Sequence, residues 1–375
     1  MTPAFGLRDL HVAGSARAGV LRTAHGEIDT PVFMPVGTQA SVKGLMPSDL
    51  ESARASCILA NTYHLWLRPG AELIRRAGGL HAFMGWHHPI LTDSGGFQIM
   101  SLAHLVEIDE EGAAFCSHLD GSARLLRPED AMAVQALLGS DIAMVLDVCT
   151  RYPSPRALLE RAVARTLRWA ERCIGIPRSD GQAIFGIVQG GTEPDLRVAC
   201  AEALAAMPFD GYGIGGLSVG EPRDQTWPAV AAACSALPVD RPRYLMGVGA
   251  PVDLMEAIAR GVDMFDCVLP TRLGRHGSAL VPGGRLDLRK ITLARRDGPL
   301  DPACDCLACT KFSVGYLHYL TRADADLARV LLSVHNVRFL TRLASAARTA
   351  ILDGSFAEFH RVWTATNTGA AREER

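Results

Sequence analysis

Residues 261–275 have the sequence GVDMFDCVLPTRLGR, and this stretch indicates how the chain folds. The apolar run 264–269 is typical of a buried strand, yet one carboxylate, Asp266, interrupts it near its C-terminal end. A buried carboxylate costs free energy unless something compensates for it. Two arginines, Arg272 and Arg275, follow in a predicted glycine-containing loop. The pattern favours a reactive acid beside an anion-binding surface, although an aspartate that merely ends a strand by capping the next turn would give the same pattern.

Similar short apolar runs occur along the chain, and most of them precede a helical pattern. The predicted strands lie at 31–36, 56–62, 89–93, 141–147, 183–188, 211–216, 243–247 and 264–269. Alternating strands and helices predict a parallel sheet, and eight such units over roughly 240 residues fit a (β/α)₈ TIM barrel. A doubly wound open sheet is the alternative, but no GxGxxG sequence follows the first strand.

Polar residues or glycines stand at the ends of nearly all these strands. They are Thr62, Asp93, Asp147, Gln189, Gly215, Gly216, Gly247, which follows Met246, and Asp266. In a barrel the strand C-termini converge on one face, where active sites are built. Three acids and a glutamine at one mouth are much harder to explain structurally than one acid alone.

The overall composition is that of a globular protein and excludes several classes. The chain has 375 residues, 48% of them hydrophobic, and a net charge of -2, so any surface for nucleic acid must be local. The window 270–322 is such a place, with nine basic and four acidic side chains. We expect neither a secretory signal nor a membrane helix, and ten cysteines without a secretory context point to the reducing cytoplasm.

A cysteine cluster near the C-terminus predicts a metal site. Cys304, Cys306 and Cys309 have the spacing CxCxxC, and His335 follows after 25 residues. Three thiolates and an imidazole suit tetrahedral zinc, and four protein ligands make the zinc structural rather than catalytic. His318 competes with His335 for the fourth position, and we expect His335 near the start of a helix.

These features predict three parts of the chain. The catalytic barrel, with an N-terminal hairpin, occupies 1–280 and carries an inserted hairpin at about 105–125. A zinc-binding subdomain follows at 281–350, and residues 351–375 form a C-terminal helix and a disordered tail.

Five motifs in this order, together with the cysteine cluster, resemble those of bacterial tRNA-guanine transglycosylases. The motifs are 93–98 (DSGGFQ), 189–191 (QGG), 215–221 (GGLSVGE), 244–249 (YLMGVG) and 266–272 (DCVLPTR). The resemblance extends from about residue 5 to 365.

The resemblance implies that guanine at the wobble position of certain tRNAs is exchanged for a 7-deazaguanine base. Asp266 matches the family nucleophile, which traps the sugar C1′ covalently as retaining glycosidases do. Asp93 matches the acid that protonates the departing base and deprotonates the incoming one. The family forms homodimers, so a homodimer is implied here.

The resemblance also implies how the base is held. Asp147 would accept from N1–H and N2–H₂ of guanine, whereas Gln189 and the Gly216 N–H would donate to O6. Phe97 and Met246 would sandwich the ring, although both could be plain core residues. Further matches are Cys149, Leu217, Val219, Glu221 and Gly247 for the base, and Arg272 and Arg275 for the tRNA.

The resemblance implies 7-aminomethyl-7-deazaguanine as the incoming base. Relatives that take the bulkier queuine have glycine where this chain has Val219. The chain departs from the family pattern at two positions near the expected substrates. Val148, beside Asp147, stands where the family has a glutamate, and Ala250 stands where the family often has a basic residue. The alternatives are a barrel nucleosidase or other hydrolase, and an RNA-binding partner subunit, which should have lost the acids.

Overall fold

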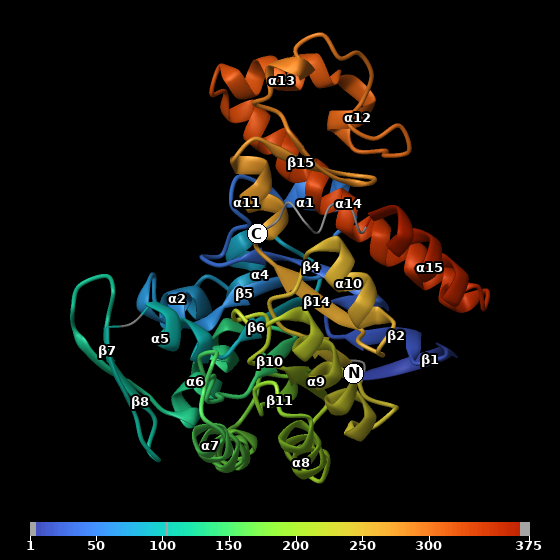
Figure 1. Ribbon diagram of the computed structural model, residues 1–375. Helices are drawn as coiled ribbons and strands as arrows, with labels where there is room; N and C mark the ends of the chain where they lie inside the picture. The colour runs from blue at the N-terminus through green and yellow to red at the C-terminus, as the bar shows by residue number, and fades with distance from the viewer. Residues whose placement is uncertain (1–4, 103, 368–375) are drawn as a thin grey trace.

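The structure of the chain is a computed structural model that describes residues 5–102 and 104–367. Eight parallel strands form a closed barrel in the order β10-β11-β12-β13-β14-β4-β5-β6, which confirms the predicted fold (Figure 1). The barrel strands are β4 (Val32–Gly37), β5 (Ile58–Asn61), β6 (Ile90–Asp93), β10 (Ile142–Met144), β11 (Ala183–Val188), β12 (Gly211–Ile214), β13 (Arg243–Leu245) and β14 (Met264–Cys267). Each of them lies within one of the predicted runs, except that β4 extends one residue beyond its run, to Gly37.

The strand that holds Asp266 closes the barrel. In β14, Phe265 pairs with Leu245 of β13 on one side and with Phe33 of β4 on the other. All three side chains are fully buried. Strands covered on both faces read as continuous apolar runs, so a carboxylate is tolerated only at the C-terminal end, where the strand reaches the mouth.

Helices follow the barrel strands along the chain, and most of them cover the outside of the barrel (Figure 1). They are α1 (Pro47–Ser52), α2 (Thr62–Leu67), α3 (Ala71–Arg76), α4 (Gly79–Met84), α5 (Gly96–Leu102), α6 (Pro128–Leu138), α7 (Arg156–Ile174), α8 (Pro194–Ala205), α9 (Arg223–Ala236) and α10 (Pro251–Ile258). Several begin with proline, whose missing N–H and fixed φ suit the first turn. Across the described ranges, none of the helices is both long and apolar enough to span a membrane.

An N-terminal antiparallel sheet closes the end of the barrel opposite the mouth. It consists of β1 (Gly6–Ala13), β2 (Ala16–Thr23) and β3 (Gly26–Thr30). Arg17 of β2 forms a buried ion pair with Asp263, which precedes β14, at 2.9 Å. The same guanidinium donates to the carbonyls of Val239 and Arg241, before β13. The predicted hairpin is therefore two strands of a three-stranded lid.

The predicted insertion after the third barrel strand is also present, but it has three strands rather than two. β7 (His104–Ile108), β8 (Ala113–Cys116) and β9 (Ala123–Leu126) form an antiparallel sheet that projects to one side of the barrel (Figure 1). Ala113 and Leu126 are paired and buried, so the third strand completes a small apolar face.

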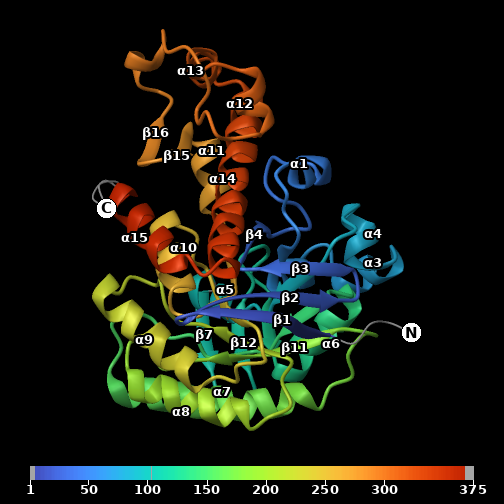
Figure 2. The ribbon, with the colours of Figure 1, turned by 90° about the vertical axis from the view of Figure 1, so that its right-hand side faces the viewer.

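The C-terminal part comprises α11 (Leu269–Arg275), β15 (Ser278–Val281), β16 (Gly284–Asp287), a 3₁₀ turn (Ile291–Leu293), α12 (Leu307–Lys311), α13 (Val314–Arg322), α14 (Asp326–Leu352) and α15 (Phe356–Asn367). Helix α14 runs from the barrel into the region of the cysteines (Figure 2). It packs tightly on α11, because a Cβ at Gly274 would lie 2.6 Å from the backbone nitrogen of Ser333. The tail expected after α15, residues 368–375, lies outside the described residues.

Candidate functional site

A cavity of about 400 Å³ opens at the C-terminal ends of the barrel strands. This volume is in the range of sites for small molecules. Most of the predicted catalytic and base-binding residues line it: Asp93, Phe97, Asp147, Cys149, Gln189, Gly216, Leu217, Val219, Met246, Gly247 and Asp266. The lining does not include Glu221, Arg272 or Arg275. The barrel thus brings together residues that are up to 173 positions apart in the sequence.

Asp266 is held in a fixed orientation at the end of β14. Its Oδ1 accepts hydrogen bonds from the Tyr244 hydroxyl at 2.5 Å and from the Gly247 N–H at 2.7 Å. Among the described residues, Oδ2 accepts no hydrogen bond, so one oxygen is anchored and the other is available to the cavity. Burial raises the pKa of Asp266, and the two hydrogen bonds oppose this by stabilising the carboxylate.

Asp93, at the end of β6, is in a different environment. Its Oδ1 accepts from the Thr62 N–H at 3.0 Å, and its Oδ2 accepts from Asn61 at 2.5 Å and from Gln98 at 3.2 Å. Burial raises the pKa of Asp93 to about 7, and the charge of Asp266 acts in the same direction against these hydrogen bonds. A carboxyl group that titrates near neutrality can both donate and accept a proton.

Asp147 and Gln189 are already joined across the floor of the cavity. Gln189 Nε2 donates to Asp147 Oδ2 at 2.5 Å, and the Ser94 hydroxyl donates to Oδ1 at 3.4 Å. Burial raises the pKa of Asp147 to about 6, since the hydrogen bond from Gln189 offsets it only partly. Gly96 allows this packing, because a Cβ there would lie 2.9 Å from Asp147 Oδ1.

Glu221 lies outside the cavity lining and holds the backbone of residues 218–219, which form one wall of the cavity. The Glu221 carboxylate accepts from the backbone N–H groups of Ser218 at 2.5 Å and Val219 at 2.9 Å. A trans peptide holds its C=O opposite its N–H, so the Leu217 carbonyl points away from Glu221. Behind this wall lies a second cavity of about 220 Å³, and Gly216 and Val219 line both. Val219 therefore stands between the two spaces.

The remaining predicted residues of the cavity fall into two groups. Phe97 is 49% exposed and lines the cavity, so the interpretation of it as a plain core residue is wrong. Met246 is partly buried and packs against the core while it lines the cavity. Val148 is buried in the core and outside the lining, so its side chain replaces the family's glutamate without entering the cavity. Ala250 caps α10, away from the lining.

Arg272 and Arg275 lie in α11 rather than in the expected loop. The helix begins at Leu269, and Pro270 lies in its first turn, where a proline favours helix formation. Arg272 is exposed and Arg275 is partly buried, one helical turn from it. Because α11 follows Asp266 within three residues, both arginines lie next to the mouth on a rigid element.

Several residues that contact the predicted acids or lie in or near the cavity were not singled out from the sequence. Tyr244 and Asn61 each donate to a carboxylate, and His64 lines the cavity with a pKa lowered by burial. Tyr244 lies inside the motif 244–249, and Asn61 precedes Thr62 at the end of a predicted strand. Their positions in the sequence were therefore weak signals of a role in the site. Arg197 of α8, which donates to backbone carbonyls of loops that line the cavity, gave no signal, because nothing in the helix pattern distinguishes it.

The three cysteines and His335 meet as predicted. Their sulfur atoms lie 3.7, 3.5 and 3.3 Å from His335 Nδ1, for Cys304, Cys306 and Cys309 in turn. Tetrahedral zinc, with Zn–S and Zn–N bonds of about 2.3 and 2.0 Å, requires about 3.5 Å between sulfur and nitrogen. The residues therefore fit zinc, and they are mostly buried.

The other ring nitrogen of His335 fixes which atom faces the cysteines. His335 Nε2 contacts the Leu280 carbonyl at 2.7 Å, which leaves Nδ1 free to bind a metal. His318, the competing ligand, contacts the Leu288 carbonyl instead. His335 lies in the third turn of α14, so the expectation of a helix start is wrong. The longer helix brings the imidazole beneath the cysteine loop from the barrel side.

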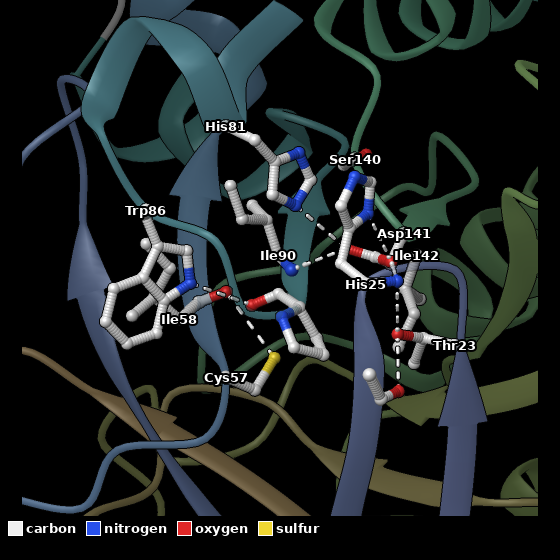
Figure 3. A network of polar contacts seen from close by, with 12 residues as sticks. Thr23, His25, Cys57, Ile58, His81, Trp86, Ile90, Ser140, Asp141 and Ile142 are labelled. Carbon is white, nitrogen blue, oxygen red and sulfur yellow. Dashed lines mark hydrogen bonds and ion pairs between the residues drawn. The ribbon is translucent and has the colours of Figure 1, made fainter. Parts of the chain in front are cut away.

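A second cluster of metal-ligand type lies at the opposite end of the barrel. His25 Nδ1 and His81 Nε2 contact the two oxygens of Asp141 at 2.9 and 3.1 Å, and the Ile90 N–H donates to it at 2.8 Å (Figure 3). Burial alone would raise the pKa of Asp141, but the hydrogen bonds, from His81 first, lower it to about 2.

The geometry of this cluster favours a structural hydrogen-bond network over a metal site. The two imidazoles are stacked, with centroids 3.6 Å apart and planes inclined by 17°. A ring nitrogen binds a metal in the plane of its ring, and two stacked planes offer no common point nearby. Asp141 thus ties the turn between β2 and β3, and helix α4, to the start of β10.

Comparison with known proteins gives matches over nearly the whole chain. A sequence model of the family described as queuine tRNA-ribosyltransferase matches residues 12–368. A queuine tRNA-ribosyltransferase of Thermus thermophilus is 54% identical over 349 residues, 93% of this chain and 91% of the relative. One of Symbiobacterium thermophilum is 53% identical over 352 residues, 94% of this chain and 88% of the relative. The matched range includes both the barrel and the cysteine cluster.

Proposed function

The chain belongs to the queuine tRNA-ribosyltransferase family, and from this we propose that it replaces guanine at the wobble position of tRNA by 7-aminomethyl-7-deazaguanine through a covalent intermediate on Asp266. The family makes the chain a tRNA-guanine pentosyltransferase of queuosine synthesis. The observation that carries the proposal is the pair of acids at the mouth: Asp266 with one oxygen anchored and one open, and Asp93 with a pKa near 7.

In the first half of the reaction, Asp266 Oδ2 attacks C1′ of the ribose and the bond from C1′ to N9 of guanine breaks. The departing guanine takes a proton from the carboxylic acid of Asp93. In the second half, the Asp93 carboxylate removes a proton from the incoming base, whose N9 attacks C1′ and releases Asp266. Two displacements at one carbon retain its configuration, as in glycosidases with a carboxylate nucleophile.

The base is read by groups on the floor and wall of the cavity. Asp147 accepts from the two adjacent donors of guanine, while Gln189 and the Gly216 N–H donate to O6. Gln189 Nε2 carries two hydrogens, so its hydrogen bond to Asp147 leaves one for the base. The Leu217 carbonyl, directed away from Glu221, offers an acceptor for the aminomethyl group. Phe97 and Met246 cover the ring.

Zinc would bind Cys304, Cys306, Cys309 and His335 and would have a structural role, since four protein ligands leave it no open position. Arg272 and Arg275, on α11 beside the mouth, would contact tRNA phosphates next to the wobble nucleotide. We also expect the family's homodimer.

Incubation of the protein with tRNA and labelled guanine tests the proposed function. Label should enter the tRNA at a rate that 7-aminomethyl-7-deazaguanine suppresses by competition. Release of free guanine from tRNA without incorporation would instead identify a hydrolase. Neither reaction, with tRNA still bound, would identify an RNA-binding subunit.

Replacing Val219 with glycine should change which base is inserted. Wild-type protein should prefer the aminomethyl base over queuine by roughly 10- to 200-fold in kcat/KM, since a cyclopentenediol must displace Val219 from a packed wall. Val219→Gly opens the wall towards the second cavity, so the preference should shrink to within a few-fold, with Val219→Ala in between. Competition kinetics with both bases measures the ratio.

The matched control is Val268→Ala, because Val268 lines the same cavity beside Asp266 rather than the 7-position wall. Its base preference should equal that of wild type. A wild-type kcat/KM for queuine equal to or above that for the aminomethyl base would contradict the assignment of Val219.

A further inference from the structure

Arg197 in α8 is a buried cation that holds the two loops beneath the base cavity. It is fully buried, and no acidic side chain of the described residues forms an ion pair with it. Its guanidinium donates instead to four backbone carbonyls, those of Gly215 at 2.7 Å, Gly191 at 2.8 Å, Val188 at 2.9 Å and Gly216 at 3.4 Å. These carbonyls flank Gln189 and Gly216, the proposed donors to O6 of the base.

An unpaired buried guanidinium is an unusual choice for structure alone. Burial lowers the pKa of Arg197 to about 10, so the group stays charged at neutral pH. Replacing a whole buried ion pair by packed apolar side chains is often neutral or stabilising, whereas removal of Arg197 alone would leave four buried carbonyls without these donors. A fold that only needed to fill this space would not require a cation, so its charge must do something for the loops it contacts.

The direction of the Gly215–Gly216 peptide group suggests what the charge of Arg197 does. The Gly215–Gly216 peptide is trans, and Arg197 binds its carbonyl at the shortest of the four distances. The N–H of Gly216 therefore points away from Arg197. Among the described residues this N–H has no hydrogen-bond partner, and Gly216 lines the cavity. It is a free donor at the place where a base carbonyl is expected.

We propose that Arg197 is a positioning residue that directs and polarises the Gly216 N–H toward O6 of the guanine ring. This inference deepens the proposed function and rests on it. A charged donor on a peptide carbonyl strengthens the N–H of the same peptide as a donor, because hydrogen bonds in a chain polarise one another. The same guanidinium fixes the carbonyls on both sides of Gln189, the second donor to O6.

The contact geometry requires arginine rather than any cation. Four carbonyls from two loops match the planar fork of a guanidinium, whereas a lysine ammonium is a single point with three donors. The loop at Gly190 is also closely packed on α8, since a Cβ at Gly190 would lie 3.0 Å from the backbone nitrogen of Arg197. Arg197→Lys should therefore restore only part of what Arg197→Met loses.

A comparison of two free bases separates positioning from general support. In 6-thioguanine a sulfur, a much weaker acceptor, replaces O6, and the donors that face Asp147 are unchanged. Arg197→Met should weaken guanine binding on the order of 10-fold. The affinity for 6-thioguanine should change less than about 2-fold, because that base has little to gain from a polarised N–H. Calorimetric Kd values without tRNA, for wild type, Arg197→Met and Arg197→Lys, give the comparison.

Arg243→Met is the matched control. Arg243 is also buried and donates to the carbonyls of Leu237 and Gly261, but it lies at the opposite end of the barrel. This variant should lose thermal stability and keep the wild-type ratio of guanine to 6-thioguanine affinity. Equal losses for both bases in Arg197→Met, or in Arg197→Lys if the first variant does not fold, would reduce Arg197 to a structural residue. Exchange of labelled guanine by wild-type protein tests the underlying function separately.

Discussion

Replacing Asp266 with asparagine should abolish the covalent protein–tRNA species and reduce guanine exchange on the order of 10³-fold or more, since loss of a nucleophile has effects of this size. The amide has the size of the carboxylate, and its oxygen can still accept from Tyr244 and Gly247. The fold and the cavity should therefore survive, and only the nucleophilic oxygen is lost. Denaturing gel electrophoresis of the protein with tRNA and a competing base measures the species.

Asp210→Asn is the control for this experiment. Asp210 is an aspartate at the start of β12, where it accepts from the Ile184 N–H and pairs with Arg178, far from the mouth. It should form as much covalent species as wild type. A band of wild-type intensity in Asp266→Asn would contradict the role of Asp266 and would direct attention to Asp93, the other acid at the mouth.

Replacing Cys306 with alanine should remove the metal and lower the melting temperature by roughly 10 °C or more. The reason is that the binding free energy of structural zinc, about 10–16 kcal/mol in small domains, is available only to the folded state. The effect should extend beyond the cysteine loop, because α14 carries His335 and also packs on α11 at Gly274. If Arg272 and Arg275 of α11 contact the tRNA as proposed, affinity for tRNA should fall more than affinity for a free base.

Metal analysis and thermal unfolding of Cys306→Ala and Cys234→Ala check this result. Cys234 is a buried cysteine of α9 outside the cluster, so its variant should retain one zinc per chain and show only the modest cost of a small cavity. One zinc per chain and unchanged stability in Cys306→Ala would show that the cluster is not the metal site.

The sequence was sufficient for the barrel, because each strand is encoded locally. A buried strand is a short apolar run of four to eight residues, and a polar residue at its end is visible without knowledge of its neighbours. Asp93, Asp147 and Asp266 could therefore be assigned to one mouth once eight units were counted. The cysteine spacing was equally local, and it predicted a cluster that the fold does assemble.

The tertiary structure alone decided how these residues are supported. Asp266 is anchored by Tyr244, 22 positions away, and Asp93 by Asn61, 32 positions away, and neither pairing has a sequence pattern. Arg197 could not be recognised either, since carbonyl acceptors belong to every residue type. The sequence by itself determined which groups we propose for the chemistry, because chemistry depends on side-chain type. The structure decided their protonation, orientation and reach, because these depend on burial and on partners that only the closed barrel brings together.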